Sequence, residues 1–185
     1  MALLTDSTRI AAGCLRKGGL IAYPTESVFG LGCIPENQQA VSRLRTIKQR
    51  PAEQGLILIT DRLERVQSFL KPLSARQKSL IHARRHKPVT WLVPASTDCP
   101  AWLLGRHDCL AIRITQHEGA RKLCRQAESA LVSTSANRRG QVPAKTATEA
   151  LHTLGNELDC ILSASTGLAR TVSEIRDLKT GKVYR

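Results

Sequence analysis

Apolar residues recur along the chain with two different periods, which indicates helices and strands in alternation. Residues 38 to 48 have the i, i+3, i+4 apolar spacing of an amphipathic helix, and Pro51 prevents its continuation. The same kind of pattern predicts helices over residues 6 to 17 and 118 to 127. Further helices are expected after three capping signals, which begin at Asp61, Ser74 and Thr146.

Short apolar runs, typical of buried strands, separate these helices. They occupy residues 20–23, 56–59, 89–93, 110–114 and 131–134. Residues 172 to 185 have the pattern of a hairpin that turns near Lys179. No repeat or linker divides the chain, so we expect one α/β domain over residues 1–185 with a mixed sheet.

The formal net charge of +13 predicts an anionic partner, which could be nucleic acid, nucleotide or an anionic membrane. A membrane is the weakest of these, because no segment has a basic amphipathic stripe and no apolar run is long enough to span a bilayer. Aromatic residues make up only 3%, so RNA should be bound through its backbone and shape. The alternative is a basic surface without a function.

Sequence patterns for targeting, cysteine pairing and metal binding limit the compartment and the kinds of site that are expected. The N-terminus lacks the charged start and apolar stretch of a signal peptide, so a cytoplasmic protein is expected. The six cysteines contain no C-x-x-C pair and are expected to be free thiols. The five histidines have no metal-binding spacing, so no protein-bound metal is expected. P-loop, dinucleotide-binding and nucleophile-elbow motifs do not occur either.

Three polar elements at helix or strand positions can carry chemistry. Lys48 and Arg50 stand at a helix end, where cations are also favourable without any function. Residues 133–137, Ser-Thr-Ser-Ala-Asn, follow an apolar strand, where ligands collect in open α/β sheets, but they also suit an ordinary turn. Arg113 lies inside an apolar strand and needs a partner or a cavity, unless it faces water from an edge strand.

Six motifs in a fixed order connect these elements to a known family, the YrdC-like threonylcarbamoyl-AMP synthases. The chain resembles the family's short bacterial (TsaC-type) form over roughly residues 8 to 185, and Lys-x-Arg with Ser-x-Asn is the family signature. The motifs are Ile21-Ala-Tyr-Pro-Thr-Glu26 with Phe29-Gly-Leu-Gly32, Lys48-Gln-Arg-Pro51 with Gly55-Leu-Ile-Leu58, Pro88-Val-Thr-Trp91, Ala111-Ile-Arg-Ile114, Ser133-Thr-Ser-Ala-Asn137 and Ser173-Glu-Ile-Arg-Asp177.

The resemblance implies a twisted mixed α/β sheet flanked by helices around a basic cavity. It implies a nucleotidyltransferase that makes L-threonylcarbamoyladenylate and pyrophosphate from L-threonine, bicarbonate or CO2, and ATP with Mg²⁺. A separate threonylcarbamoyl-transferase complex then modifies adenosine 37 of tRNAs that read codons starting with A. Weak electrostatic binding of tRNA is a further expectation.

By the same resemblance, Lys48 and Arg50 are the catalytic residues, and no residue is a metal ligand. Threonine is expected to contact Thr25, Arg113 and Ser173. The nucleotide is expected to contact Lys48, Arg50, Thr90, Ser133, Ser135, Asn137 and Arg185.

Some positions depart from the family pattern. Arg85-His86-Lys87 replaces the usual Trp-Pro-Gly, Arg138-Arg139 replaces a usual serine-containing loop, and position 54 is Gln54. Two of these changes add positive charge near the expected cavity. These changes and the net charge favour an alternative function, a non-enzymatic RNA-binding factor. A second alternative is a carbamoyl-transfer domain, because hydrogenase-maturation proteins contain a module of this kind.

Overall fold

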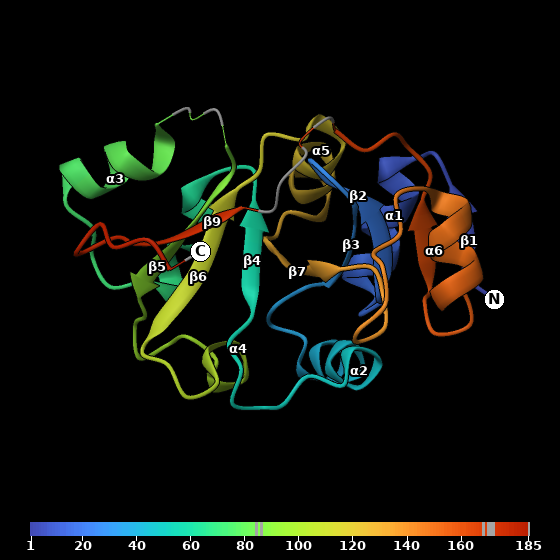
Figure 1. Ribbon diagram of the computed structural model, residues 1–185, viewed down its shortest axis with the longest axis horizontal. Helices are drawn as coiled ribbons and strands as arrows, with labels where there is room; N and C mark the ends of the chain where they lie inside the picture. Colours follow the sequence, from blue (N-terminus) through green and yellow to red (C-terminus); the bar gives the residue numbers. More distant parts are fainter. Residues whose placement is uncertain (84, 86, 168, 170–172, 185) are drawn as a thin grey trace.

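Nine strands form one mixed sheet with helices on both of its faces in the computed structural model, which describes residues 1–83, 85, 87–167, 169 and 173–184 (Figure 1). The strands are β1 (Leu3–Thr5), β2 (Ile21–Pro24), β3 (Phe29–Cys33), β4 (Ile57–Thr60), β5 (Val89–Pro94), β6 (Cys109–Ile114), β7 (Leu131–Ser135), β8 (Cys160–Leu162) and β9 (Glu174–Asp177). The helices are α1 (Thr8–Arg16), α2 (Gln38–Lys48), the 3₁₀ helix η1 (Leu63–Phe69), α3 (Ala75–His82), α4 (Ala101–Leu104), α5 (Glu118–Ala127) and α6 (Ala147–Leu154).

The spatial order of the strands differs strongly from their order in the chain. It is β1-β8-β2-β3-β7-β4-β6-β5-β9. The pairs β1–β8, β2–β8, β4–β6 and β5–β9 are parallel, and the other four are antiparallel. At the centre, Ile57 lies opposite Ser133, and Ile59 lies opposite Arg113. Because residues that pair in register lie on one face, Ser133 and Arg113 share a face of the sheet.

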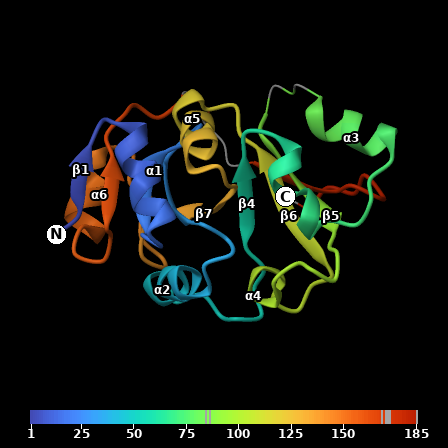
Figure 2. The same ribbon diagram turned by 180° about the vertical axis from the view of Figure 1, so that it is seen from behind.

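Alternating apolar side chains of the strands give the sheet one core on each face. Helices α1 and α5 pack against each other and, together with Ile21, Tyr23 and Ile59, form one core. Helices α2 and α6 belong to the other core, which includes Ala22 and Leu58. Figure 2 shows the molecule from the α1 side. The expected α/β architecture is therefore confirmed, and none of the helices in the described part of the chain is long and apolar enough to cross a membrane.

Most of the predicted helix ends are confirmed. Helix α2 spans the expected residues and ends where Gln49 adopts a left-handed conformation with φ of 45°. Ser74 forms a complete capping box at α3, and the Thr146 side chain caps α6. The cap predicted at Asp61 is wrong: its carboxylate binds Arg65 Nε at 2.5 Å, and the helix that follows is η1, without a side-chain cap.

The predicted C-terminal hairpin is present within residues 174–184. Arg176 forms an antiparallel bridge with Val183, and the Asp177 N–H donates to the Lys182 carbonyl oxygen at 2.9 Å. The remaining predicted hairpin residues, at 172 and 185, lie outside the described part of the chain.

Strand β3 was not predicted, because two of its five residues are glycines, which weaken a strand pattern. These glycines make room for the ring of Tyr23, which lies opposite Gly30. A Cβ atom at Gly32 would lie 2.3 Å from the Val132 carbonyl oxygen and 2.9 Å from the Tyr23 ring. The buried Tyr23 hydroxyl thereby reaches across β3 and donates to Ser133 Oγ at 2.8 Å. The short elements β1, β8 and α4 were not predicted either, since three or four residues carry no measurable period.

Candidate active site

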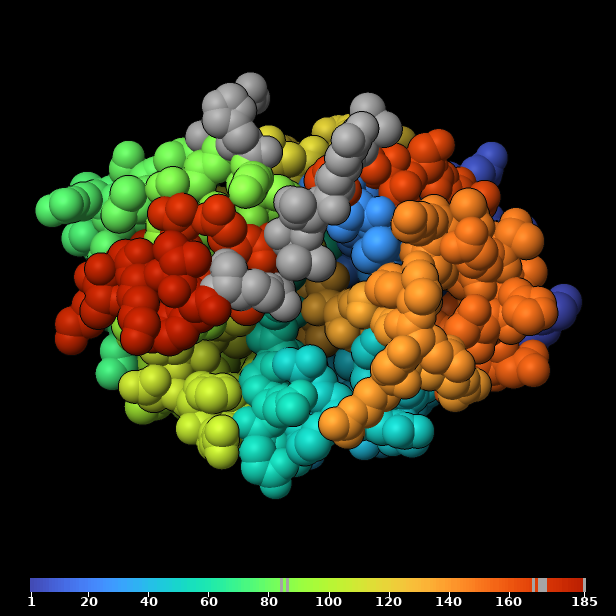
Figure 3. All heavy atoms as spheres, in the orientation of Figure 1, coloured from blue at the N-terminus to red at the C-terminus, as the bar shows by residue number. Residues whose placement is uncertain are grey.

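A cleft of about 290 Å³ opens where the ends of several central strands meet. That volume is at the lower end of the range for small-molecule sites. Figure 3 shows the recessed centre of this face, surrounded by the segment after α2, the loop after β7 and the C-terminal segment. Its lining consists of Thr25, Glu26, Ser27, Val28, Phe29, Gly30, Arg50, Leu56, Ile57, Pro88, Arg113, Ser133, Thr134, Ser135 and Ser173.

The cleft brings together residues that the sequence placed at separate sites. Six of the predicted site residues line it, namely Thr25, Arg50, Arg113, Ser133, Ser135 and Ser173. Three others contact these lining residues from behind: Lys48 and Asn137 bind Ser135, and Thr90 binds Ser173. Arg185 lies outside the described residues. The structure therefore gathers every predicted site residue that it describes around one cleft.

Lys48, the last residue of α2, is bound to the turn that follows β7. Its Nζ lies 2.8 Å from the Ser135 carbonyl oxygen, and 2.6 Å from both the carbonyl oxygen and Oδ1 of Asn137. The Ser135 hydroxyl also donates to Asn137 Oδ1 at 2.6 Å. Three acceptors use all three donors of an ammonium group, so Lys48 contributes its charge to the cleft but no free N–H. Burial and the charge of Arg50 lower the pKa of Lys48 to about 8.

Arg50 reaches the cleft because α2 ends just before it. The Arg50 N–H donates to the Arg45 carbonyl oxygen at 2.9 Å, and Pro51 turns the chain away. One terminal nitrogen of the guanidinium donates to the Gly55 carbonyl oxygen, whereas Nε is buried and has no hydrogen-bond partner in the described part of the chain. Burial and the charge of Arg45 lower the pKa of Arg50, although a guanidinium remains protonated at neutral pH. Arg50 therefore places a positive charge in the cleft, and its hydrogen bond to Gly55 fixes the position of the guanidinium.

Hydroxyl groups line the cleft near Arg113. The Thr25 hydroxyl donates to the Val28 carbonyl oxygen at 2.7 Å and fixes the turn between β2 and β3. The Thr90 and Ser173 hydroxyls lie 2.9 Å apart. These groups provide polar, uncharged positions beside an arginine, as in a site for a small polar ligand.

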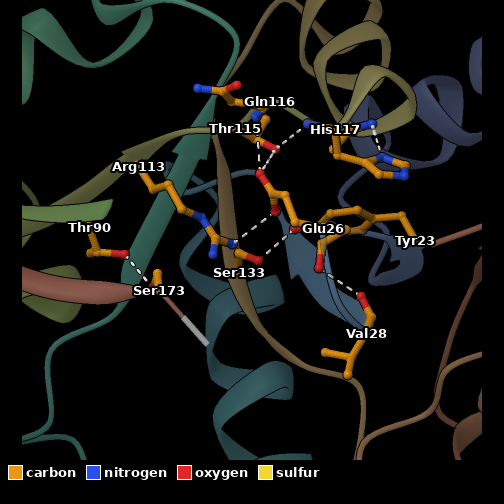
Figure 4. A network of polar contacts seen from close by, with 12 residues as sticks. Tyr23, Glu26, Val28, Thr90, Arg113, Thr115, Gln116, His117, Ser133 and Ser173 are labelled. Carbon is orange, nitrogen blue, oxygen red and sulfur yellow. Dashed lines mark hydrogen bonds and ion pairs between the residues drawn. The ribbon is translucent and has the colours of Figure 1, made fainter. Parts of the chain in front are cut away.

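Glu26 has no role in the sequence-based site, yet it is the carboxylate beside Arg113 (Figure 4). Its Oε2 lies 3.9 Å from a terminal nitrogen of Arg113, and its Oε1 accepts hydrogen bonds from Thr115 and Gln116. Burial raises the pKa of Glu26, but the Arg113 charge and these hydrogen bonds outweigh it and hold the pKa below its ordinary value. The carboxylate is therefore ionised at neutral pH. The signal in the sequence was Arg113 itself, since a cation in an apolar strand needs a partner.

The charges of the cleft suit an anionic ligand. Its lining holds Arg50 and Arg113 against the one carboxylate of Glu26, and Lys48 lies directly behind. Within the described residues, no group of three or more His, Cys, Asp or Glu could hold a metal ion. All six cysteines are free thiols, as predicted.

The basic residues that depart from the family pattern are partly engaged within the chain. Arg138 forms an ion pair with Glu157, and one Arg139 terminal nitrogen lies 3.4 Å from the Gln49 carbonyl oxygen. The Arg85 guanidinium lies over the ring of Trp91, 5.4 Å from its centre. Arg139 is therefore the added charge that comes near the end of α2, at Gln49, which stands between Lys48 and Arg50.

Comparisons with known proteins give consistent results. Threonylcarbamoyl-AMP synthase of Nitrosococcus oceani is 48% identical over 177 residues, which cover 96% of each chain. That of Methylobacillus flagellatus is 50% identical over 171 residues, which cover 92% of this chain and 94% of the relative. The structure of P. abyssi Sua5 complexed with L-threonine has a TM-score of 0.87 at 28% identity, covering 99% of this chain. It covers 56% of the Sua5 chain, so this chain spans about half of that protein's length. A family model described as telomere recombination matches residues 13–185, and the chain therefore belongs to the Sua5/YciO/YrdC family.

Proposed function

We propose that the chain is a threonylcarbamoyl-AMP synthase, which forms L-threonylcarbamoyladenylate and pyrophosphate from L-threonine, bicarbonate or CO2, and ATP. One observation supports the proposal most directly: Arg50 and Arg113 line the same cleft, and the Lys48–Ser135–Asn137 network lies next to it. The names of the relatives at 48% and 50% identity support it. A cleft with two separate cationic positions suits two anionic substrates that must react with each other.

The reaction joins a carbamate to the α-phosphorus of ATP. The threonine amine takes up CO2 to give the carbamate and releases one proton. A carbamate oxygen then forms a bond to the α-phosphorus, while the bond from that phosphorus to the bridging oxygen of pyrophosphate breaks. Both substrates are anionic, so catalysis consists mainly of positioning and of stabilising the negative charge.

Arg50 is the residue that we assign to the reacting groups. Its guanidinium lines the cleft and can donate to oxygens of the carbamate and the α-phosphate. Lys48 holds the Ser135–Asn137 turn and adds positive charge behind it, which stabilises negative charge in the cleft. The Ser133 hydroxyl accepts from Tyr23 and can donate its own hydrogen to the nucleotide without adding charge. Ser135, Asn137, Thr90 and Arg185 are assigned to the nucleotide as well.

Threonine is assigned to the opposite part of the cleft. Arg113 binds its carboxylate, because a guanidinium offers a fork of N–H donors that matches carboxylate geometry. Thr25 and Ser173 line the same cleft as Arg113 and supply hydroxyl groups. The P. abyssi Sua5 structure, at 28% identity, contains L-threonine, which supports an amino-acid position in this fold.

Mg²⁺ is proposed to enter with ATP. Magnesium is usually bound through substrate phosphates and few protein ligands, which fits a cleft whose described residues include no group of three or more His, Cys, Asp or Glu that could hold a metal ion. When bound, Mg²⁺ offsets the negative charge of the triphosphate.

The product is proposed to serve a separate transferase complex that modifies adenosine 37 of tRNAs. The net charge of +13 supports weak electrostatic binding of tRNA. It also favours the second candidate function, a non-enzymatic RNA-binding protein.

One assay separates the two functions. We expect AMP derivative and pyrophosphate to form only when threonine, bicarbonate and ATP are all present. Serine should be a poorer substrate by a finite factor, since a missing methyl contact is worth only about 1–3 kcal/mol. Equal pyrophosphate release without any amino acid would contradict the synthase, whereas no release under any of these conditions would favour the RNA-binding function.

A further inference from the structure

Glu26 joins the turn between β2 and β3 to the opposite side of the cleft (Figure 4). Its Oε1 accepts hydrogen bonds from the Thr115 hydroxyl at 2.7 Å and from the Gln116 N–H at 3.0 Å, both in the segment after β6. The turn itself is fixed, because the Thr25 N–H and hydroxyl both donate to the Val28 carbonyl oxygen. Protein contacts thus fix both the backbone turn that carries Glu26 and one oxygen of its carboxylate, and they do so without a bound substrate.

A second contact fixes the same turn from another side. The Gly167 N–H donates to the Thr25 carbonyl oxygen, and the Ala169 N–H donates to the Glu26 carbonyl oxygen, both at 2.9 Å. A Cβ atom at Gly167 would lie 2.6 Å from that Glu26 oxygen, so glycine permits the close approach. The backbone of Glu26 is therefore held between two segments that are distant in the sequence.

The other carboxylate oxygen faces Arg113. The Glu26 and Arg113 side chains are only 13% and 16% exposed, and Oε2 lies 3.9 Å from a terminal nitrogen of the guanidinium. Neither Oε2 nor Arg113 Nε has a hydrogen-bond partner among the residues that the structure describes. A cation this far from water needs a compensating charge, and in the described part of the chain Glu26 is the carboxylate within ion-pair distance. The pair leaves other N–H groups of the guanidinium available to a ligand.

We propose that Glu26 is a positioning residue for the amino-acid substrate, which acts through Arg113 by holding the guanidinium at the cleft wall with its remaining donors toward the substrate carboxylate. This inference rests on the proposed function. A long arginine side chain loses rotamer freedom when it is fixed by a ligand. Glu26 fixes it before the ligand binds. The effect should be confined to the amino acid, because Arg50 and Lys48 serve the nucleotide.

The test is a double-mutant cycle of Glu26→Gln and Arg113→Lys, with calorimetric binding of L-threonine and of ATP. Glu26→Gln keeps the acceptor for Thr115 and Gln116 but removes the charge. We expect threonine affinity to fall about tenfold, while ATP affinity changes less than about twofold. In the Arg113→Lys background, Glu26→Gln should add less than about a twofold further loss, because residues that act through one another are not additive. Additive losses would overturn the proposal.

Two further variants provide the controls. Glu118→Gln removes an exposed carboxylate that pairs with Arg125 at the start of α5, and it should change neither affinity. If Glu26→Gln does not fold, Glu26→Asp keeps the charge but shortens its reach. It should then weaken threonine binding selectively, and an unchanged threonine affinity would overturn the proposal. Wild-type protein that binds no threonine and forms no pyrophosphate would reject the proposed function itself. Normal wild-type binding with an unaffected Glu26→Gln variant would reject only the role of Glu26.

Discussion

Arg50 gives the most direct residue-scale test of the site. Arg50 lines the cleft, and among the described residues its buried Nε has no hydrogen-bond partner. Losing a donor that stabilises developing charge typically costs about 10²–10³ in turnover. We therefore expect Arg50→Ala to lose at least about a hundredfold in product formation with little change in melting temperature. Arg50→Lys should recover only part of the activity, because an ammonium cannot reproduce the bidentate fork. Near wild-type turnover of Arg50→Ala would show that Arg50 only stabilises the end of α2 and has no role in the reaction.

Lys48 predicts a pH dependence of nucleotide binding. Its pKa is lowered to about 8, whereas a free lysine titrates near 10.4. As the pH rises through about 8, the amine loses its proton and the cleft loses one positive charge. We expect ATP affinity, measured without threonine to avoid titration of the substrate amine, to fall over this range. In Lys48→Arg the side chain stays protonated, and the fall between pH 7 and 10 should disappear. The same inflection in the variant would mean that another group titrates.

At the scale of elements, the regular parts were predictable and the glycine-rich or very short parts were not. Helix α2 was predicted with its observed bounds, because its apolar period, its cationic end and Pro51 all agree. Strand β3 was hidden by Gly30 and Gly32, whose presence is explained only by the packing of Tyr23 across the strand. The need for such a glycine arises from a tertiary contact, which no local pattern in the sequence records.

Two glycines in different elements should respond in opposite ways to the same substitution. A Cβ atom at Gly13, in the middle of α1, would have no neighbour within 4 Å, whereas at Gly32 it would lie 2.3 Å from a backbone oxygen. Gly13→Ala should therefore raise the free energy of unfolding by about 0.5–1 kcal/mol through helix propensity. Gly32→Ala should lower it by about 1–3 kcal/mol, because the strands must shift to admit the methyl group. Urea unfolding of both variants measures the two changes, and equal signs would contradict the packing of β3.

At the scale of the whole molecule, strand order determines the site. The strands that lead to Thr25, Ser133 and Arg113 are β2, β7 and β6, which the chain forms far apart and the sheet brings together. The sequence indicated polar groups at strand ends, but their adjacency depends on β7 lying between β3 and β4, which local patterns do not specify. Glu26 was missed for the same reason, since its partners in the folded protein are 87 to 90 residues away.

The net charge of +13 leads to a prediction about RNA in which neighbouring arginines behave differently. Arg138 is paired with Glu157, so much of its charge is already compensated, whereas Arg139 approaches an uncharged group, the carbonyl oxygen of Gln49. A side chain that meets one phosphate contributes about 0.7–0.9 to the slope of log K against log salt. We therefore expect Arg139→Gln to flatten the slope for tRNA by about one unit and Arg138→Gln by less than half of that.

Measurements from 50 to 200 mM salt on these two variants, their double mutant and a control provide the test. Arg76→Gln is a suitable control, because it removes an exposed arginine from α3, which lies at the opposite end of the molecule from α6 and the loop that precedes it (Figure 1). The double mutant should flatten the slope by about one to two units, and the control should change it less than Arg139→Gln does. Equal changes in all variants would indicate that tRNA senses only the total charge. The loss of a phosphate contact must appear in the salt dependence. An unchanged slope in the double mutant would therefore mean that Arg139 contacts the nucleotide or solvent and not tRNA.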